Sequence, residues 1–301
     1  MASPPSPRWK LLALDLDGTL VGSGGEISRE NIDAVHRARE AGIKVVVCTG
    51  RGLRECRRFL DALGQTEPVA VAGGSIIADP VTGRTLHRFS MDPALVHDVV
   101  NLMHRHGHPA LVLKDPAAAS LDYLVVESEH RHPLDPVMHW WFDAMKVGVR
   151  HVQHLHEDEH PEHTVRIGVF GISTSMHRLV AELEPVVGSR GTYHNFPAVV
   201  LPTHRQRLGP GENFHILELF DQAGNKWSAV SHLAARWGID PAHTAAIGDE
   251  VNDLAMIRGA GLGVAMGNAV PLVRDAAARS TLHHDQHGVA HAIDRMLEGE
   301  W

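Results

Sequence analysis

The chain has 301 residues, of which 44% are hydrophobic and 21% are charged, a balance typical of a globular protein. Its formal net charge of −8 argues against a nucleic-acid-binding surface, which normally carries a basic excess. No apolar run approaches the ~18 residues that span a bilayer, and the start lacks the apolar segment of a signal peptide, so we expect a cytoplasmic protein without nucleic-acid or membrane partners.

The N-terminal part of the chain alternates predicted strands and helices. A helix begins after Ser28, whose hydroxyl is placed to cap it, and Gly42 closes it. A later strand pattern breaks at Gly73 and Gly74. Alternation of this kind predicts a parallel sheet with right-handed crossovers. The strands expected here cover residues 11–16, 43–48 and 68–77.

The middle of the chain, residues 86–215, differs in texture because it carries most of the prolines and histidines. Helices are still predicted at 93–105 and 176–187, and strands at 121–127, 164–170 and 214–220. Such a mixed α+β pattern favours a separate domain inserted into the first.

The densest cluster of histidines lies in residues 151–163. The spacing of these side chains matches no closed set of metal ligands, and the interleaved acidic residues are typical of a solvated loop. We favour that interpretation, with a store of zinc or nickel as the alternative. The histidines concerned are His151, His154, His156, His160 and His163.

After residue 216 the regular alternation resumes. Asn225 can cap a helix over 226–237, and residues 243–261 predict a strand, an acidic turn and a helix. A further strand and turn cover 261–269, and a terminal helix covers 287–297. The two ends of the chain are therefore expected to form one sheet.

Four polar clusters fall at the predicted strand ends or at a helix start, where open α/β sheets bind ligands. Two carboxylates about 5 Å apart repel by roughly 3 kcal/mol at an effective dielectric near 20, so a close pair needs a cation or a shared proton. Converging carboxylates suit Mg²⁺, whereas a hydroxyl, a backbone N–H and an ammonium suit a phosphate dianion. The clusters are Asp15 with Asp17, Thr49 with Gly50, Lys226, and Asp249 with Asn252 and Asp253.

These residues stand in motifs that resemble, in order, those of the haloacid dehalogenase-like superfamily, and most closely its Cof-type phosphatases. The motifs are DLDGT, VCTGR, the NK at 225–226, and GDEVND followed by GVAMGNA. The resemblance implies an α/β fold: a Rossmann-like three-layer parallel-sheet core of residues 1–85 and 216–301, with an inserted α+β cap domain over 86–215 that selects the substrate. It also implies a Mg²⁺-dependent phosphatase, a monomer or homodimer, acting on a small phosphorylated metabolite such as a sugar or polyol phosphate.

The resemblance further implies roles for individual residues. Asp15 would be the nucleophile that forms an aspartyl-phosphate, and Asp17 the general acid and base. Lys226 would neutralise the transferring group and the nucleophile. The phosphate would be held by Leu16, Thr49, Gly50, Arg51, Lys226 and Asn252. The Mg²⁺ ligands would be the Asp15 carboxylate, the Asp17 backbone carbonyl and Asp249, with Asp253 supporting the metal site or Lys226.

Two positions depart from the family's pattern. Gly73 stands where the family often has Asn, so recognition of the leaving group would differ. Glu250 stands where Gly is common, and we expect its side chain to face solvent. The alternative functions are a phosphomutase or phosphotransferase on the same fold, and a non-catalytic protein that binds a phosphorylated ligand.

Overall fold

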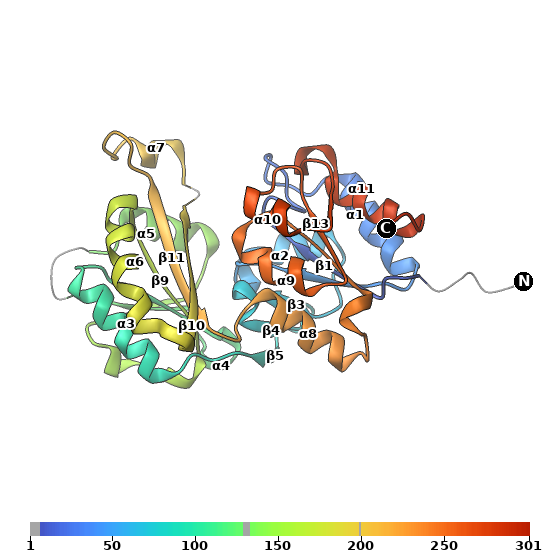
Figure 1. Ribbon diagram of the computed structural model, residues 1–301. Coiled ribbons are helices and arrows are strands. Elements are labelled where there is room, and N and C mark those ends of the chain that lie inside the picture. Colours follow the sequence, from blue (N-terminus) through green and yellow to red (C-terminus); the bar gives the residue numbers. More distant parts are fainter. Residues whose placement is uncertain (1–6, 129–132, 199) are drawn as a thin grey trace, which may run out of the picture. The chain divides into compact units, whose positions relative to one another are not determined.

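The computed structural model describes residues 7–128, 133–198 and 200–301, which form two compact units (Figure 1). The first unit takes in the chain up to His87 and again from Asn225 onwards, and the second runs from Arg88 to Gly224. The chain therefore leaves the first unit once and returns to it.

The first unit is built on an eight-stranded sheet in the order β14-β13-β12-β1-β2-β3-β4-β5. Its central strands are parallel, and β4 runs antiparallel to β3. The strands are β1 (Leu11–Asp15), β2 (Lys44–Cys48), β3 (Val69–Val71), β4 (Ile76–Ala78), β5 (Thr85–Arg88), β12 (Thr244–Gly248), β13 (Leu262–Ala265) and β14 (Arg279–Ser280).

Helices lie on both faces of this sheet (Figure 1), so the expected three-layer α/β architecture is confirmed. Among them α1 packs against α11, and α9 packs against both α8 and α10. The predicted helix caps also hold: the side chains of Ser28 and Asn225 accept the N–H groups of Asn31 and Ser228. The helices are α1 (Arg29–Glu40), α2 (Leu53–Ala62), α8 (Lys226–Arg236), α9 (Leu254–Gly259), α10 (Pro271–Ala276) and α11 (Gly288–Leu297).

The apolar runs at the centre of the sheet explain where its polar ends lie. Every residue of β1 and β12 is buried, as parallel strands covered on both faces require. Leu14 pairs with Ile247, and Asp15 pairs with Cys48, so the carboxyl ends of β1, β2 and β12 reach the same edge. The strand predicted for 11–16 ends at Asp15, because the chain turns and the Leu16 carbonyl accepts the N–H of Val21.

The single strand predicted for 68–77 is instead two short antiparallel strands joined by a turn at Gly73 and Gly74. β3 ends at Val71, a single turn covers Ala72–Gly74, and β4 returns antiparallel. Gly74 has φ +97°, and a Cβ built on it would lie 2.3 Å from the backbone carbon of Asn225. A glycine is therefore required where this turn meets the start of α8.

The second unit is built on a six-stranded sheet in the order β10-β11-β9-β6-β7-β8, antiparallel except for the β7–β8 pair. α3 and α6 bury a core of aliphatic side chains against it, including Val99, Leu179 and Ile167. Its elements are α3 (Pro93–Arg105), β6 (Ala110–Lys114), α4 (Pro116–Ala119), β7 (Tyr123–Val126), α5 (Pro136–Met145), β8 (Val149–Val152), β9 (Thr164–Ile172), α6 (Ser173–Val187), β10 (Gly191–Pro197), α7 (Pro202–Arg205) and β11 (Phe214–Asp221).

The second boundary between the units lies after Gly224, later than the expected residue 216. β11 pairs with β9 and β10 along its length, so this strand belongs to the second unit. Within the described residues, no helix combines the length and the apolar character needed to cross a membrane.

Candidate active site

The carboxyl edge of the first sheet is organised around the ammonium of Lys226. This residue opens α8 directly after the N-cap Asn225, and it is completely buried. Its Nζ lies 2.5 Å from Asp15 Oδ1 and 2.5 Å from Asp253 Oδ1, and 3.3 Å from Asn252 Oδ1. One lysine thus draws together residues from β1 and from the turn after β12.

Asp253 also fixes the backbone of the turn that carries it. Its second carboxylate oxygen accepts the N–H groups of Asp249 and Glu250 at 2.9 and 3.0 Å. The residue is fully buried, and a Cβ on Gly248 would lie within 2.6 Å of its side chain. Asp253 therefore pairs with Lys226 and shapes the loop that presents Asp249.

Asp249 is clamped from two sides by residues to which the sequence analysis gave no role. Thr19 Oγ1 donates to its Oδ1 at 2.8 Å, and Asn268 Nδ2 donates to its Oδ2 at 3.3 Å. The same Nδ2 donates to the carbonyl of Gly18 at 2.8 Å. Thr19 lies in the motif DLDGT and Asn268 in the motif GVAMGNA, both quoted above. Their place in these motifs is the feature of the sequence from which a role at the site could have been predicted.

The carboxylates of Asp15, Asp249 and Asp253 form a group whose ligand atoms lie within 4.8 Å of one another. Burial raises the pKa of Asp15 well above its usual range, and Asp253 adds to the effect while Lys226 opposes it. Burial and Asp253 likewise raise the pKa of Asp249 to about 6. Burial disfavours the charged form of Lys226, but attraction to Asp15 and Asp253 prevails and raises its pKa. Three ionised carboxylates and one ammonium leave two negative charges, which a divalent cation would offset.

The predicted phosphate-binding residues lie beside this group. Thr49 is buried at the end of β2, and its hydroxyl oxygen accepts the N–H of Arg51 at 3.1 Å. A Cβ on Gly50 would lie 4.0 Å from Asn252 Nδ2, so the loop after β2 faces the loop after β12. The Gly73 N–H donates to the Thr49 carbonyl at 2.9 Å, which supports this loop from the reversal after β3.

Asp17 is not part of the group formed by Asp15, Asp249 and Asp253. It follows the end of β1, its side chain is 47% exposed, and Arg51 holds it with two hydrogen bonds, Nε to Oδ2 at 2.8 Å and Nη2 to Oδ1 at 2.6 Å. Because β1 ends at Asp15, the alternation of side chains along a strand does not determine where the Asp17 side chain points. The guanidinium predicted to bind phosphate is engaged with the predicted acid and base instead.

The two departures from the family's pattern have structural explanations. Gly73 has φ +72°, a conformation that few residues other than Gly and Asn adopt readily, so it preserves the turn but offers no amide. Glu250 is half-buried and accepts the N–H of Val251 at 2.8 Å, which caps the turn before α9. Its carboxylate is not part of the group formed by the buried aspartates.

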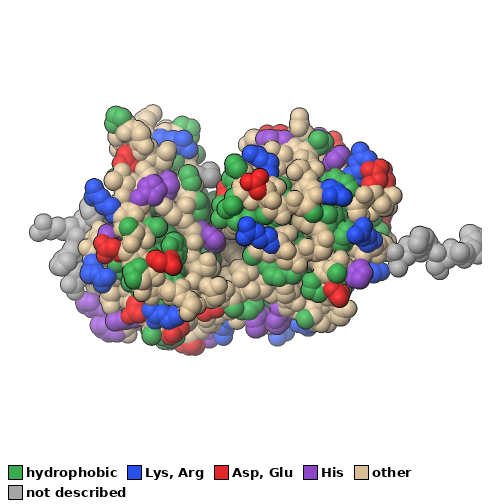
Figure 2. Space-filling view, in the orientation of Figure 1, with side chains coloured by type: hydrophobic (Ala, Val, Ile, Leu, Met, Phe, Trp, Pro, Cys, Tyr) green, Lys and Arg blue, Asp and Glu red, His purple; other side chains and the backbone are tan. Residues whose placement is uncertain are grey.

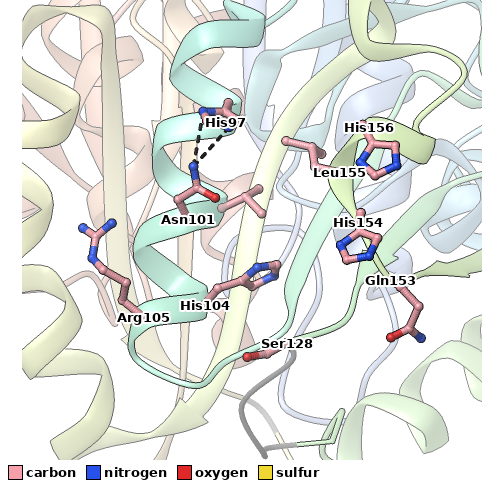
Figure 3. Close-up of a pocket in the computed structure, with 10 residues that line it drawn as sticks. His97, Asn101, His104, Arg105, Ser128, Gln153, His154, Leu155 and His156 are labelled. Atoms are coloured by element: carbon pink, nitrogen blue, oxygen red, sulfur yellow. Dashed lines mark hydrogen bonds between the residues drawn. The ribbon is translucent and has the colours of Figure 1, made fainter.

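A cavity of about 610 Å³ lies in the second unit, between α3 and the segments after β7 and β8 (Figure 3). Its described lining carries four histidines and Arg105, but no carboxylate and none of the predicted site residues. The chemistry expected from the sequence is therefore located in the first unit.

Comparison with known proteins agrees with this geometry. Residues 12–293 match the family model described as haloacid dehalogenase-like hydrolase. "Phosphatase YwpJ" of Bacillus subtilis is 29% identical, with 96% of this chain and 100% of the relative covered. "5-amino-6-(5-phospho-D-ribitylamino)uracil phosphatase YwtE" of the same organism is 28% identical, covering 97% and 99%. The crystal structure of a haloacid dehalogenase-like hydrolase from Bacteroides thetaiotaomicron is 26% identical, with a TM-score of 0.73 over 96% of this chain and 99% of that one.

These matches extend across both units, so the resemblance to Cof-type members is confirmed along with the α/β fold class. The chain belongs to the haloacid dehalogenase-like hydrolases and is an enzyme of that family.

Proposed function

We propose that this enzyme is a Mg²⁺-dependent phosphatase that hydrolyses a small phosphorylated metabolite through an aspartyl-phosphate intermediate. The observation that carries the proposal is the buried Lys226 ammonium, 2.5 Å from both Asp15 and Asp253, with Asp249 within ligand distance of both carboxylates. This arrangement supports the proposal, because Asp15 would accept the phosphoryl group, Lys226 would supply a fixed positive charge and Asp249 would bind the metal.

The residues present fit a hard divalent cation. The described donors are carboxylate oxygens, which Mg²⁺ prefers, and the excess negative charge of the group is buried. Asp15, Asp249 and the backbone carbonyl of Asp17 would hold the ion. When bound, it would offset the charge of the phosphate and of the aspartates.

In the first step the Asp15 carboxylate attacks phosphorus, and the bond from phosphorus to the ester oxygen breaks. Asp17 donates a proton to the departing alkoxide, which leaves as an alcohol. In the second step Asp17 takes a proton from water as the water oxygen attacks phosphorus, and Asp15 is released with inorganic phosphate. Arg51 donates a hydrogen bond to each carboxylate oxygen of Asp17, so this contact must loosen before Asp17 can hold the proton that it donates.

The transferring phosphoryl group would be held by the loops around Lys226. Thr49 and the N–H of Gly50 would contact it from the end of β2, and Asn252 from the turn after β12. Leu16 would contribute its backbone N–H. Arg51 would reach the phosphate only after leaving Asp17.

A sugar or polyol phosphate is the substrate class that we propose. Support comes from relatives such as YwtE, named for a substrate that carries a phosphorylated ribityl chain. The second unit would serve as the cap that excludes water and selects the substrate. The cytoplasmic location and the monomeric or homodimeric state stay predictions.

The test is phosphate release from a panel of sugar, polyol and nucleotide phosphates, with and without Mg²⁺, by the wild type and the Asp15→Asn variant. We expect Mg²⁺-dependent release that the variant lacks although it still folds, as circular dichroism would show. Release by Asp15→Asn at a substantial fraction of the wild-type rate would overturn the covalent mechanism. Transfer of phosphate between two sugars without net release would instead identify a phosphomutase, and binding without turnover would identify a ligand-binding protein.

A further inference from the structure

The histidine-rich segment of the second unit brings two imidazoles and one carboxylate together. His160 precedes the single turn Pro161–His163, and this turn carries Glu162 and His163. One ligand atom from each of these three residues lies within 4.8 Å of those of the other two. His163 Nε2 is 3.2 Å from Glu162 Oε1, and the two imidazole centroids are 5.8 Å apart.

The His163 ring has one nitrogen that the protein leaves unsatisfied. Its Nδ1 is buried and has no hydrogen-bond partner among the described residues. A buried polar atom without a partner costs free energy, which a metal ion bound at Nδ1 itself would remove; an ion at Nε2, the nitrogen beside Glu162, would not. Side-chain spacing in the sequence could not reveal this, since it depends on what packs over the ring.

A second group of two histidines and one carboxylate differs from the first, because its side chains already bind other parts of the protein. In the first unit, His283, His284 and Asp285 also lie within ligand distance of one another. There Asp285 accepts the N–H and hydroxyl of Ser23 at 2.8 and 2.6 Å, and His284 Nδ1 contacts the Val21 carbonyl at 3.2 Å. Those side chains already hold the loop after β1, whereas Glu162 is 60% exposed and its carboxylate can turn toward an ion.

The backbone that carries the first group is fixed by its neighbours. The carbonyl of His160 accepts from Lys114 Nζ at 3.2 Å, that of Glu162 from the Ser90 hydroxyl at 2.8 Å, and that of His163 from the Asp115 N–H at 2.9 Å. Each of the three residues is thus held in position, so binding a ligand would order only side chains.

Charge near the group also permits a cation. Lys114 is buried close by, but its ammonium is paired with Asp158 and hydrogen-bonded to Thr164 Oγ1 at 2.7 Å. The positive charge beside the group is therefore already compensated, and the carboxylate contributes a negative charge.

From these contacts we propose that His160, Glu162 and His163 form a site for a divalent transition-metal ion of the zinc class. Two imidazoles with one carboxylate suit Zn²⁺, Co²⁺ or Ni²⁺ and disfavour Mg²⁺ and Ca²⁺, which prefer oxygen ligands. Zn–N distances of ~2.0–2.1 Å would place the donor atoms about 3.4 Å apart, within reach of small side-chain rotations from the present spacing. Three protein ligands leave one position of a tetrahedral ion open to water or to a further ligand. This site is separate from the carboxylate group at Lys226.

The experiment is calorimetric titration of the untagged full-length chain with Zn²⁺ in excess Mg²⁺, with Co²⁺ absorption as a second measure of nitrogen ligation. The Asp249→Asn background removes a carboxylate of the first unit from competition. We expect one equivalent of Zn²⁺ to bind in this background. His163→Ala and His160→Ala should each weaken binding at least about 100-fold. Glu162→Gln, an isosteric change at an exposed side chain, provides a test should a histidine variant fail to fold.

His154 and His156 provide the matched control, because they lie in the same segment but line the cavity of Figure 3 and belong to neither group. The His154→Ala/His156→Ala double variant should bind Zn²⁺ like its parent. The proposal is overturned if the parent binds no Zn²⁺, or if binding survives the changes at His160, Glu162 and His163. If the control variant failed to bind Zn²⁺, the proposal would also be rejected, because the ligands would then be the histidines that line the cavity.

Discussion

The Lys226 ammonium pairs with two buried carboxylates, so its removal should lower both stability and activity. Asp15 and Asp253 would each lose a partner at 2.5 Å inside the protein. Breaking a buried pair typically costs about 3–5 kcal/mol, because a charge is left without compensation. We expect Lys226→Ala to lower the free energy of unfolding by that order and to lower kcat at least ~100-fold.

Urea denaturation and phosphate-release kinetics check this expectation. Lys44→Ala is the control, since that side chain is exposed on β2 and should change neither quantity by much. Wild-type kinetics in Lys226→Ala would mean that another cation takes the place of the ammonium.

Asn268 contacts Asp249, a proposed Mg²⁺ ligand, and the turn at Gly18. Its amide donates to both, and its Oδ1 accepts the N–H of His284 at 3.0 Å. Removing a group that orients a metal ligand commonly costs 10–100-fold in metal affinity. Asn268→Ala should therefore raise the Mg²⁺ concentration for half-maximal activity at least about tenfold, with kcat at saturating Mg²⁺ changed much less.

A Mg²⁺ titration of activity and of thermal stability separates these effects. Asn101→Ala removes an amide from an exposed position on α3 and should leave the Mg²⁺ response unchanged. An equal loss of kcat at every Mg²⁺ concentration would contradict the positioning role.

At the scale of elements, the reversal after β3 and the start of α8 depend on Gly74. A Cβ on residue 74 would lie 2.3 Å from the backbone carbonyl carbon of Asn225 and 2.5 Å from the backbone nitrogen of Lys226, so α8 would have to shift. Gly74→Ala should therefore destabilise the fold by more than the ~1–3 kcal/mol of backbone strain and should displace Lys226 from Asp15.

Gly83→Ala is the matched control for this change. Gly83 also has a positive φ, +75°, but a Cβ there meets nothing within 4 Å. Gly83→Ala should therefore lose only the stability that backbone strain costs, without the steric clash expected at residue 74. If urea denaturation gives the two variants the same loss of stability, the close approach of Gly74 to α8 does not matter energetically.

The central strands of the first unit and several of its helices could be predicted because their signals are local. Apolar runs such as 43–48 and 244–248 mark strands that are covered on both faces, and Ser28 and Asn225 cap helices through contacts three residues away. In the second unit β6, β8 and β10 were missed. β8 and β10 are edge strands with mixed polar faces, and β6 has only four apolar residues before Lys114. The pairing of all three strands depends on partners distant in the sequence.

The same distinction separates the parts of the candidate site. Asp15, Lys226 and Asp249 could be expected to lie together because each stands in a short motif at a strand end or helix start, and their roles stay proposals. The pair of Asp17 with Arg51 could not, since a sequence gives no side-chain rotamer and both residues have other possible partners. The clamp of Thr19 and Asn268 on Asp249 joins residues 230 and 19 positions apart, which no local pattern records.

At the scale of the whole molecule, each unit has its own sheet and its own buried side chains. β11 shows why the second boundary was placed too early: its sequence resembles a core strand, but its partners β9 and β10 belong to the insert. An inserted unit with its own core can change its surface without disturbing the strands that hold Asp15 and Asp249. Substrate choice and chemistry would then reside in separate parts of the chain.

The stabilisation of the folded chain by Mg²⁺ should depend on pH, because it depends on the charge of the carboxylate group. Burial raises the pKa of Asp249 to about 6, so the folded metal-free chain holds this proton more tightly than the unfolded chain, where an Asp pKa is about 3.9. This contribution to stability is fully present below about pH 4 and is lost as pH rises through about 6. Mg²⁺ competes with the proton, so it should take over the stabilising role above that range.

We therefore expect Mg²⁺ to raise the melting temperature little at about pH 5 and clearly at about pH 7.5, since a ligand at 100 times its Kd adds about 2.7 kcal/mol. Scanning calorimetry at both pH values, with and without Mg²⁺, measures the difference. Asp249→Asn should abolish most of the Mg²⁺ effect at the higher pH, because its amide carries no charge to offset. An equal Mg²⁺ effect at both pH values in the wild type would mean that Asp249 is ionised throughout, and that its burial beside Asp253 does not control metal binding.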